Sequence, residues 1–205
     1  MAIGVRSVWN LVARYFRFAR TSTSSGSGFE ADPLAQMSLQ RREQIQQFEV
    51  FYWQHEHQII LYLRRMLADD QAAYDLSQET FLRAWQNFSS IRAHTTARAW
   101  LYRVATNLAL NLLHQRTIRP QIVLDETLPD IQDMENHVSE SDLINQILLH
   151  LTPKQRSVLL LHEVHGLSCD EIGRMLGMSR TAIKGALWRA REAFRLEYQR
   201  EEERA

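Results

Sequence analysis

Basic side chains near the carboxyl-terminal end of the chain are spaced to contact nucleic acid. Residues 167–191, LSCDEIGRMLGMSRTAIKGALWRAR, have the pattern of two short helices joined by a tight turn at Gly177. Cations on the open side of the second helix can neutralise phosphates or reach base edges in a major groove. The side chains on or near that side are Arg180, Thr181, Lys184, Trp188, Arg191 and Arg195. The alternative is a plain three-helix bundle with a solvated basic face.

A second stretch that could bind nucleic acid is residues 80–124, which contain no Asp or Glu and six arginines. Within it, the helical period of WLYRVATNLALNLLHQR predicts a core face of Leu101, Val104, Ala105, Leu108 and Leu112. The opposite face carries Trp100, Arg103, Asn107 and His114, with Asn111 beside them. An aromatic ring, a cation and amides suit single-stranded or melted nucleic acid, because bases stack on rings and amides read base edges. The alternative is a solvated helix with a tryptophan at a domain corner.

Acidic side chains in DLSQETFLRAWQNF, residues 75–88, indicate a different kind of partner. The helical period predicts that Asp75, Gln78 and Glu79 lie outside. The predicted core residues are Leu76, Leu82, Trp85 and Phe88. Because phosphate repels carboxylates, this face suits a protein partner, or it is simply solvated.

The sequence HEVHG, residues 162–166, resembles a zinc-protease signature, but His162 and His165 are three positions apart rather than four. No third ligand is evident, so we interpret both as ordinary surface or partly packed histidines. We predict no catalytic residue, no metal and no cofactor.

Helices must position all of these side chains. Four prolines and seven glycines in 205 residues predict an all-α protein. Thr152, Ser168 and Ser179 have the spacing of helix N-caps, and Gly177 is expected to end a helix in the left-handed conformation. The single Cys169 suits a reducing cytoplasm, and no apolar run is long enough to span a membrane.

Composition divides the chain into two small helical domains, residues 40–119 and 143–200, joined by an acidic linker. The linker, residues 120–142, holds seven acids and no Lys or Arg. Residues 1–20 form a predicted basic amphipathic helix, separated from the rest by a Ser/Gly-rich linker, residues 21–39. That helix could contact a membrane surface or a partner, act as a transit peptide, or be a poorly ordered extension.

Taken together, the motifs resemble those of bacterial RNA polymerase sigma factors of the short extracytoplasmic-function type. The resemblance rests on DLSQETFLRAW, then RAWLYRVATNLALNLL, then the acidic linker, then LTPKQRSVLLLHEVHGLSCDEIGRMLG and RAREAF. It covers about residues 45–199 and implies two helical domains, usually called regions two and four.

The resemblance implies roles for three groups of residues. The helix that docks on the coiled coil of the polymerase β′ subunit matches at Asp75, Leu76, Gln78, Glu79 and Leu82. The part that opens and reads the promoter −10 element matches residues 89–119, and we assign to it Arg98, Trp100, Arg103, Asn107, Asn111 and His114. The helix that meets the −35 element supplies Arg180, Thr181, Lys184, Trp188, Arg189 and Arg191.

Three features depart from the family pattern. The loop SSIRAHTTAR lacks an aromatic residue two positions before Trp100, and residues 1–20 have no counterpart. Gly185-Ala186 stands where members often carry Ser-Arg, which removes a contact that could discriminate bases. We therefore expect the second domain to bind DNA poorly alone and to become specific when polymerase holds it.

The resemblance predicts a sigma factor rather than an enzyme, with core RNA polymerase and promoter DNA as partners and an anti-sigma factor as a further one. It predicts a cytoplasmic protein, or one that a partner holds at the inner membrane face. The rival prediction is a self-sufficient helix-turn-helix regulator that binds palindromic sites without polymerase.

Overall fold

A computed structural model of the chain describes residues 39–92, 97–118 and 140–203. Every regular element in these ranges is a helix, so the prediction of an all-α protein is confirmed. Residues 1–20, the Ser/Gly-rich linker up to residue 38 and the acidic linker up to residue 139 lie outside the described residues. Among the described helices, none is both long and apolar enough to cross a membrane.

The first domain consists of α2 (Leu39–Leu67), α3 (Asp70–Gln86), α4 (Phe88–Arg92) and α5 (Ala97–Ile118). Helices α2, α3 and α5 pack against one another around a core rich in aromatic residues. Phe48 of α2 lies edge-on to Trp85 and Phe88, with ring centroids 5.1 Å apart in both pairs. Such pairs add to the stabilisation that burial of their large apolar surface provides.

The buried face of α5 differs from the sequence prediction. Leu101 and Ala105 are buried as predicted, whereas Val104, Leu108 and Leu112 are only half-buried. The remaining buried residues of the helix are Tyr102, Thr106 and Ala109. The reason is that α5 contacts α2 and α3 on one side and the second domain on another, so its buried surface is wider than one stripe.

The second domain consists of α6 (Glu140–His150), α7 (Pro153–Leu159), one π turn named η2 (Leu160–Val164), α8 (Cys169–Leu176) and α9 (Arg180–Glu202). Capping boxes at Thr152 and Ser168 and the N-cap at Ser179 confirm the predicted helix starts. Helix α6 begins at Glu140, inside the segment that composition assigns to the linker. Acidic residues early in a helix are favourable there because they face the positive end of the helix dipole.

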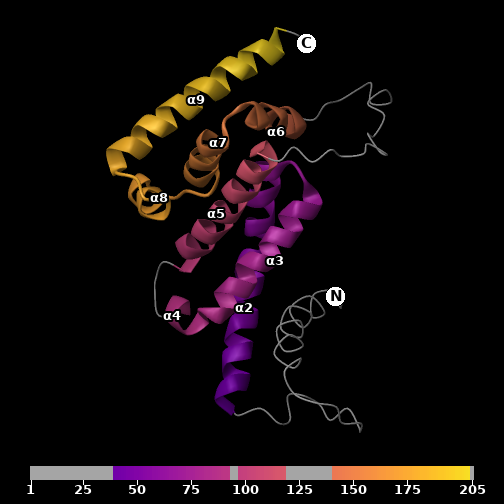
Figure 1. Cartoon of the computed structure of the whole chain (residues 1–205), viewed down its shortest axis with the longest axis vertical. Coiled ribbons are helices and arrows are strands. Elements are labelled where there is room, and N and C mark those ends of the chain that lie inside the picture. Colours follow the sequence, from indigo (N-terminus) through magenta and orange to yellow (C-terminus); the bar gives the residue numbers. More distant parts are fainter. Residues whose placement is uncertain (1–38, 93–96, 119–139, 204–205) are drawn as a thin grey trace.

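The two domains pack directly against each other, which the sequence did not indicate. Helix α5 contacts α7 and α8, and α2 contacts α6 and α7 (Figure 1). One continuous set of buried side chains runs through both domains and includes Met66 and Leu67 of α2 together with Leu148 and Leu151. Helix α9 lies along the outside of the second domain, on the far side of α7 and α8 from the first domain (Figure 1).

Candidate nucleic-acid interface

Helices α8 and α9 form a helix-turn-helix whose turn depends on two glycines. Gly177 ends α8 with φ of 65°, which confirms the predicted left-handed conformation. Gly173, which the sequence did not single out, is buried inside α8. A Cβ atom added there would lie 2.6 Å from the carbonyl oxygen of Met178, so the turn requires a residue without a side chain.

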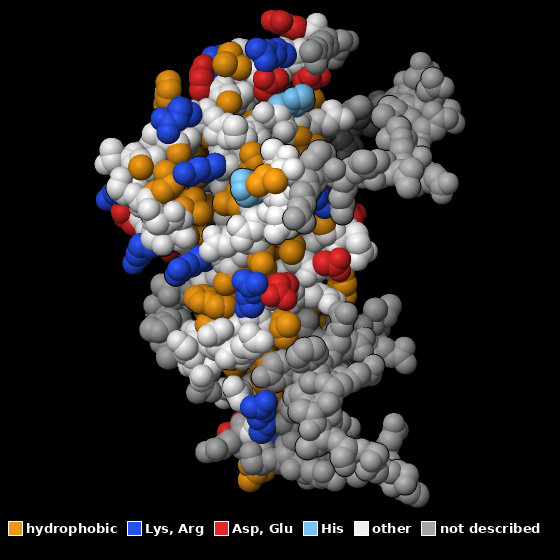
Figure 2. Space-filling model, in the orientation of Figure 1, with side chains coloured by type: hydrophobic (Ala, Val, Ile, Leu, Met, Phe, Trp, Pro, Cys, Tyr) orange, Lys and Arg blue, Asp and Glu red, His pale blue; other side chains and the backbone are white. Residues whose placement is uncertain are grey.

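Helix α9 presents the predicted basic face to solvent. Its inner face consists of the buried residues Ile183, Ala186, Leu187 and Ala190. The six residues assigned to this face, Arg180, Thr181, Lys184, Trp188, Arg189 and Arg191, are all exposed. Trp188 is 68% exposed, so its ring is accessible from solvent on this face. Figure 2 shows basic side chains spread over the end of the molecule formed by α8 and α9.

Ion pairs distinguish the cations of this face. Arg180 pairs with Asp170 at 3.4 Å, and the guanidinium of Arg191 donates twice to Glu163, at 2.5 and 2.8 Å. For Lys184 and Arg189, no ion pair occurs within the described part of the chain. These two cations can therefore contact phosphate without first breaking a bond, whereas Arg191 would have to leave Glu163.

Gly185 has a structural consequence for Arg189. A Cβ atom added at Gly185 would lie 3.6 Å from a terminal nitrogen of Arg189, at ordinary van der Waals distance. The guanidinium of Arg189 therefore lies over the surface that a larger side chain at position 185 would occupy.

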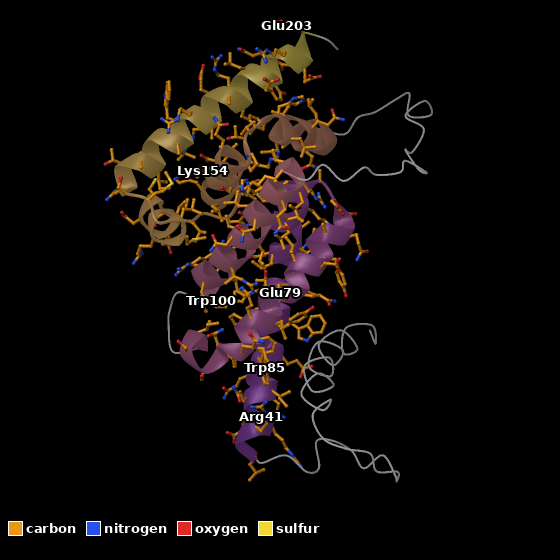
Figure 3. All side chains as sticks on the ribbon, viewed as in Figure 1. Arg41, Glu79, Trp85, Trp100, Lys154 and Glu203 are labelled. Carbon is orange, nitrogen blue, oxygen red and sulfur yellow. The ribbon has the colours of Figure 1, made fainter. Side chains whose placement is uncertain are left out.

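The stripe on α5 is divided between open surface and a groove. Arg103, Asn107, Asn111 and His114 are exposed, whereas Trp100 is half-buried and packs against the core. Asn107 and His114 line a groove of about 470 Å³ between the domains. The facing wall includes Thr152, Pro153 and Lys154 at the start of α7 and Met175 and Leu176 of α8. Figure 3 labels Trp100 on α5 and Lys154 across the domain junction.

Arg98, at the start of α5, is held by the second domain. Its guanidinium donates a hydrogen bond to the backbone carbonyl of His165 and lies 5.6 Å from the ring centre of Tyr102. The sequence placed Arg98 among the cations for nucleic acid but gave no sign of this intramolecular partner. The loop before it, residues 93–96, lies outside the described residues.

The two histidines of the HEVH segment have different surroundings. His162 lies 3.3 Å from Glu163, and His165 is buried against the first domain, where its Nδ1 shares a hydrogen bond of 2.8 Å with the Tyr102 hydroxyl. His165 is therefore not a surface histidine: it is buried and hydrogen-bonded to the other domain. Among the described residues, no cluster of three His, Cys, Asp or Glu side chains has a geometry that could hold a metal.

The acidic face of α3 lies apart from the basic surfaces. Asp75 is exposed and accepts a hydrogen bond from Gln71 at 3.1 Å, and Glu79 accepts one from Arg83 at 2.8 Å. Leu76 and Leu82, predicted as core, are only half-buried, because the buried face of α3 runs through Ala73, Ser77, Thr80, Phe81, Ala84 and Trp85. Figure 3 labels Glu79 on this helix.

Two exposed aromatic residues beside this face were missed by the sequence reading. Tyr74 and Trp53 are 41% and 42% exposed. The ring centre of Trp53 lies 5.2 Å from that of its chain neighbour Tyr52, which is buried. The spacing of Tyr74 and Gln78, four residues apart on one helix face, is the signal that could have placed Tyr74 here.

Comparison with known proteins agrees with this arrangement. Family models for Sigma-70 region 2 and for Sigma-70, region 4 match residues 51–118 and 141–194. The chain is 33% identical over 147 residues to the ECF RNA polymerase sigma factor SigW of Bacillus subtilis, covering 64% of this chain and 78% of SigW. It is also 33% identical over 168 residues to the RNA polymerase sigma factor YlaC of the same organism, covering 76% of this chain and 95% of YlaC.

Two solved structures share the fold. The sigma factor RpoE of Bartonella quintana, in complex with the anti-sigma factor NepR, superposes with a TM-score of 0.62 at 18% identity. That match covers 75% of this chain and 97% of RpoE. CnrH, in complex with the cytosolic domain of CnrY, superposes with a TM-score of 0.53 at 23% identity, covering 73% of this chain and 85% of CnrH.

Replacing Gly173 or Gly185 by alanine is expected to change the free energy of unfolding in opposite directions. Gly173→Ala forces a methyl group against the Met178 carbonyl and is expected to lower the free energy of unfolding by about 1–3 kcal/mol. Gly185→Ala fits without a clash and is expected to raise it by about 0.5–1 kcal/mol, because alanine restricts the unfolded chain. Urea denaturation of both variants measures the difference. Equal effects, or a stable Gly173→Ala protein, would contradict this geometry.

Proposed function

The chain belongs to the extracytoplasmic-function (ECF) sigma factors of bacterial RNA polymerase, and we propose that three separate surfaces carry its contacts with polymerase and promoter. Family membership rests on the matches to both sigma-70 regions and to the sigma factors SigW and YlaC. The protein therefore binds core RNA polymerase and directs transcription to promoters by recognising DNA. The assignment of each step to particular residues is our proposal.

The polymerase-docking surface is the exposed face of α3. Asp75, Gln78 and Glu79 supply its polar contacts, and the half-buried Leu76 and Leu82 supply apolar area. We add Tyr74, because its ring is exposed and tyrosine is enriched in protein interfaces. An acidic, partly apolar helix suits a protein partner and not DNA, which supports docking on the β′ coiled coil.

The −10 surface is formed by Arg98, Trp100, Arg103, Asn107, Asn111 and His114 of α5. Separated bases can stack on an aromatic ring and bond to amides, with about 1–3 kcal/mol gained per stacked base. Cations along the same face neutralise the phosphates of the strand. Helix α5 is therefore suited to hold melted DNA, because the bases of an intact duplex are stacked and paired and are not available for these contacts.

The −35 surface is the outer face of α9, with Arg180, Thr181, Lys184, Trp188, Arg189 and Arg191. The single observation that best supports the whole assignment is the separation of charge: α9 exposes cations, while α3 exposes carboxylates on a different side of the molecule. One protein can then bind DNA and a protein machine simultaneously, as a sigma factor must.

Further partners follow from the family. The structure of RpoE was determined with the anti-sigma factor NepR, and that of CnrH with the cytosolic domain of CnrY. We propose that this protein also has an anti-sigma partner, that it acts in the cytoplasm where polymerase is, and that it catalyses no reaction itself. Residues 1–20 lie outside the described residues, and sedimentation with liposomes, with and without them, tests a membrane contact.

Removal of the α3 charges tests the docking surface. The double change Asp75→Asn and Glu79→Gln keeps the size of both side chains and is expected to weaken binding to core polymerase at least tenfold. Promoter-specific run-off transcription should fall with it, while the helical circular-dichroism spectrum stays unchanged. The matched control is Glu202→Gln, an exposed acid at the far end of α9. Normal transcription by the double variant would contradict the proposal. Binding of the protein to palindromic sites without polymerase would favour a self-sufficient regulator.

Removal of one cation tests the −35 surface. Lys184→Ala is expected to weaken holoenzyme binding to promoters of every sequence and to reduce the magnitude of the slope of log K against log salt by about one, because one phosphate contact is lost. Arg200→Ala is the control, since Arg200 is engaged with Glu197 near the end of α9. A salt series with labelled promoter duplex measures both. An unchanged slope for Lys184→Ala would remove this residue from the interface.

A further inference from the structure

His165, the residue that follows η2, makes two polar contacts with the first domain. At the end of η2 the His165 backbone N–H bonds to the Leu160 carbonyl at 3.1 Å. The His165 side chain packs against the first domain, and the residue is only 8% exposed. The imidazole bonds to the Tyr102 hydroxyl at 2.8 Å. Its ring centre lies 4.6 Å from that of Tyr102 and 5.4 Å from that of Tyr62.

Arg98 of the first domain is also bound at this point of the second domain. The Arg98 guanidinium donates to the His165 carbonyl and lies over the Tyr102 ring, so it bridges the backbone of one domain and an aromatic ring of the other. A guanidinium in this position cannot bind promoter DNA in the same geometry. The outer face of α9 is not affected, because its cations remain exposed in the closed arrangement.

We propose that His165, Tyr102 and Arg98 form an intramolecular latch that holds the two domains closed in the free protein and must open before Arg98 can contact promoter DNA. The consequence for DNA binding rests on the proposed assignment of Arg98 to the −10 surface. The latch itself rests on the contacts across the domain junction. It withholds Arg98 from DNA while leaving the −35 surface accessible.

The geometry makes the latch reversible. The second ring nitrogen of His165, Nε2, is buried and has no hydrogen-bond partner among the described residues, which makes the closed state less stable than a fully satisfied junction. The other ionisable groups at this point are Tyr62 and Arg65 of α2, Arg98 and Tyr102 of α5, and Glu163 and His162 of the same segment. Glu171 of α8 also faces Arg98.

A proton on His165 would oppose closure. Burial, together with the charges of Arg98 and Arg65, lowers the pKa of His165 to about 4 in the closed protein. In the open protein a solvated imidazole has a pKa of about 6.5. The open form therefore binds more protons between these values, so closure is fully favoured above about pH 6.5 and weakens as the pH falls toward 4.

Intramolecular fluorescence energy transfer in the full chain tests the latch. Dyes are attached to cysteines introduced at the exposed positions Gln86 and Glu202, one in each domain, with Cys169 replaced by serine. Tyr102→Phe removes only the hydroxyl that bonds His165, and we expect the open-to-closed ratio to rise between about fivefold and a hundredfold at pH 7.5. Core polymerase should convert all variants to the open, low-transfer form.

The matched control is Tyr62→Phe, which removes an equally buried hydroxyl bonded to Thr106 at 2.7 Å within the first domain. Tyr62→Phe should leave the open-to-closed ratio within about twofold of the parent, because its bond does not cross the junction. The proposal is overturned by three results: equal shifts in both variants, no shift in Tyr102→Phe, or a closed protein on polymerase. None of these readouts depends on which residues contact DNA.

The pH dependence supplies a second, independent readout. Between pH 7.5 and 5.5 the open-to-closed ratio of the parent should rise about tenfold, as one proton is taken up on opening. His165→Asn keeps a polar group near the position of Nδ1 but cannot take up that proton, so its ratio should vary less than twofold over the same range. An equally steep response in His165→Asn would assign the titration to other histidines, such as His55, and would refute a latch centred on His165.

Discussion

Buried polar groups at the domain junction set the arrangement of this molecule. Arg156 of α7 is only 5% exposed, and its guanidinium donates to the carbonyls of Leu148, Leu149 and Leu151 in its own domain and to that of Met66 in the other. A buried guanidinium without such partners would be strongly destabilising. These carbonyls lie at the carboxyl-terminal ends of α2 and α6, where a cation is most favourable. The closed arrangement is therefore held by the Arg156–Met66 hydrogen bond at the end of α2 and by the Arg98–His165 hydrogen bond at the start of α5.

This junction determines which functional surfaces are available. The proposed −35 face of α9 is exposed in the closed protein, and the proposed docking face of α3 is exposed at Asp75 and half-buried at Gln78 and Glu79. The α5 stripe lies beside it, with Asn107 and His114 in the groove and Arg98 bonded to the opposite domain. In this state Arg98 is engaged by the second domain, whereas the cations of α9 are exposed.

Signals that act within a few residues could be predicted from the sequence, and contacts between distant residues could not. The capping boxes at Thr152 and Ser168 and the left-handed Gly177 follow from local hydrogen bonding, and all three have the predicted form. The exposed positions of Asp75 on α3 and of the α9 cations follow from helical period, whereas Gln78 and Glu79 are half-buried. By contrast, the bond between Tyr102 and His165 joins residues 63 positions apart, and no local pattern distinguishes His165 from a surface histidine. Gly173 was overlooked because its role depends on the approach of Met178 across a turn.

The central claim is that polymerase and promoter DNA separate two domains that are packed together in the free protein. A cryo-electron microscopy structure of the promoter open complex tests it most directly. The account predicts that α3 contacts the β′ coiled coil, that Trp100 and Arg98 contact unpaired −10 bases, and that His165 is far from Tyr102. A complex in which the His165–Tyr102 and Arg156–Met66 contacts persist while DNA is melted on α5 would contradict it.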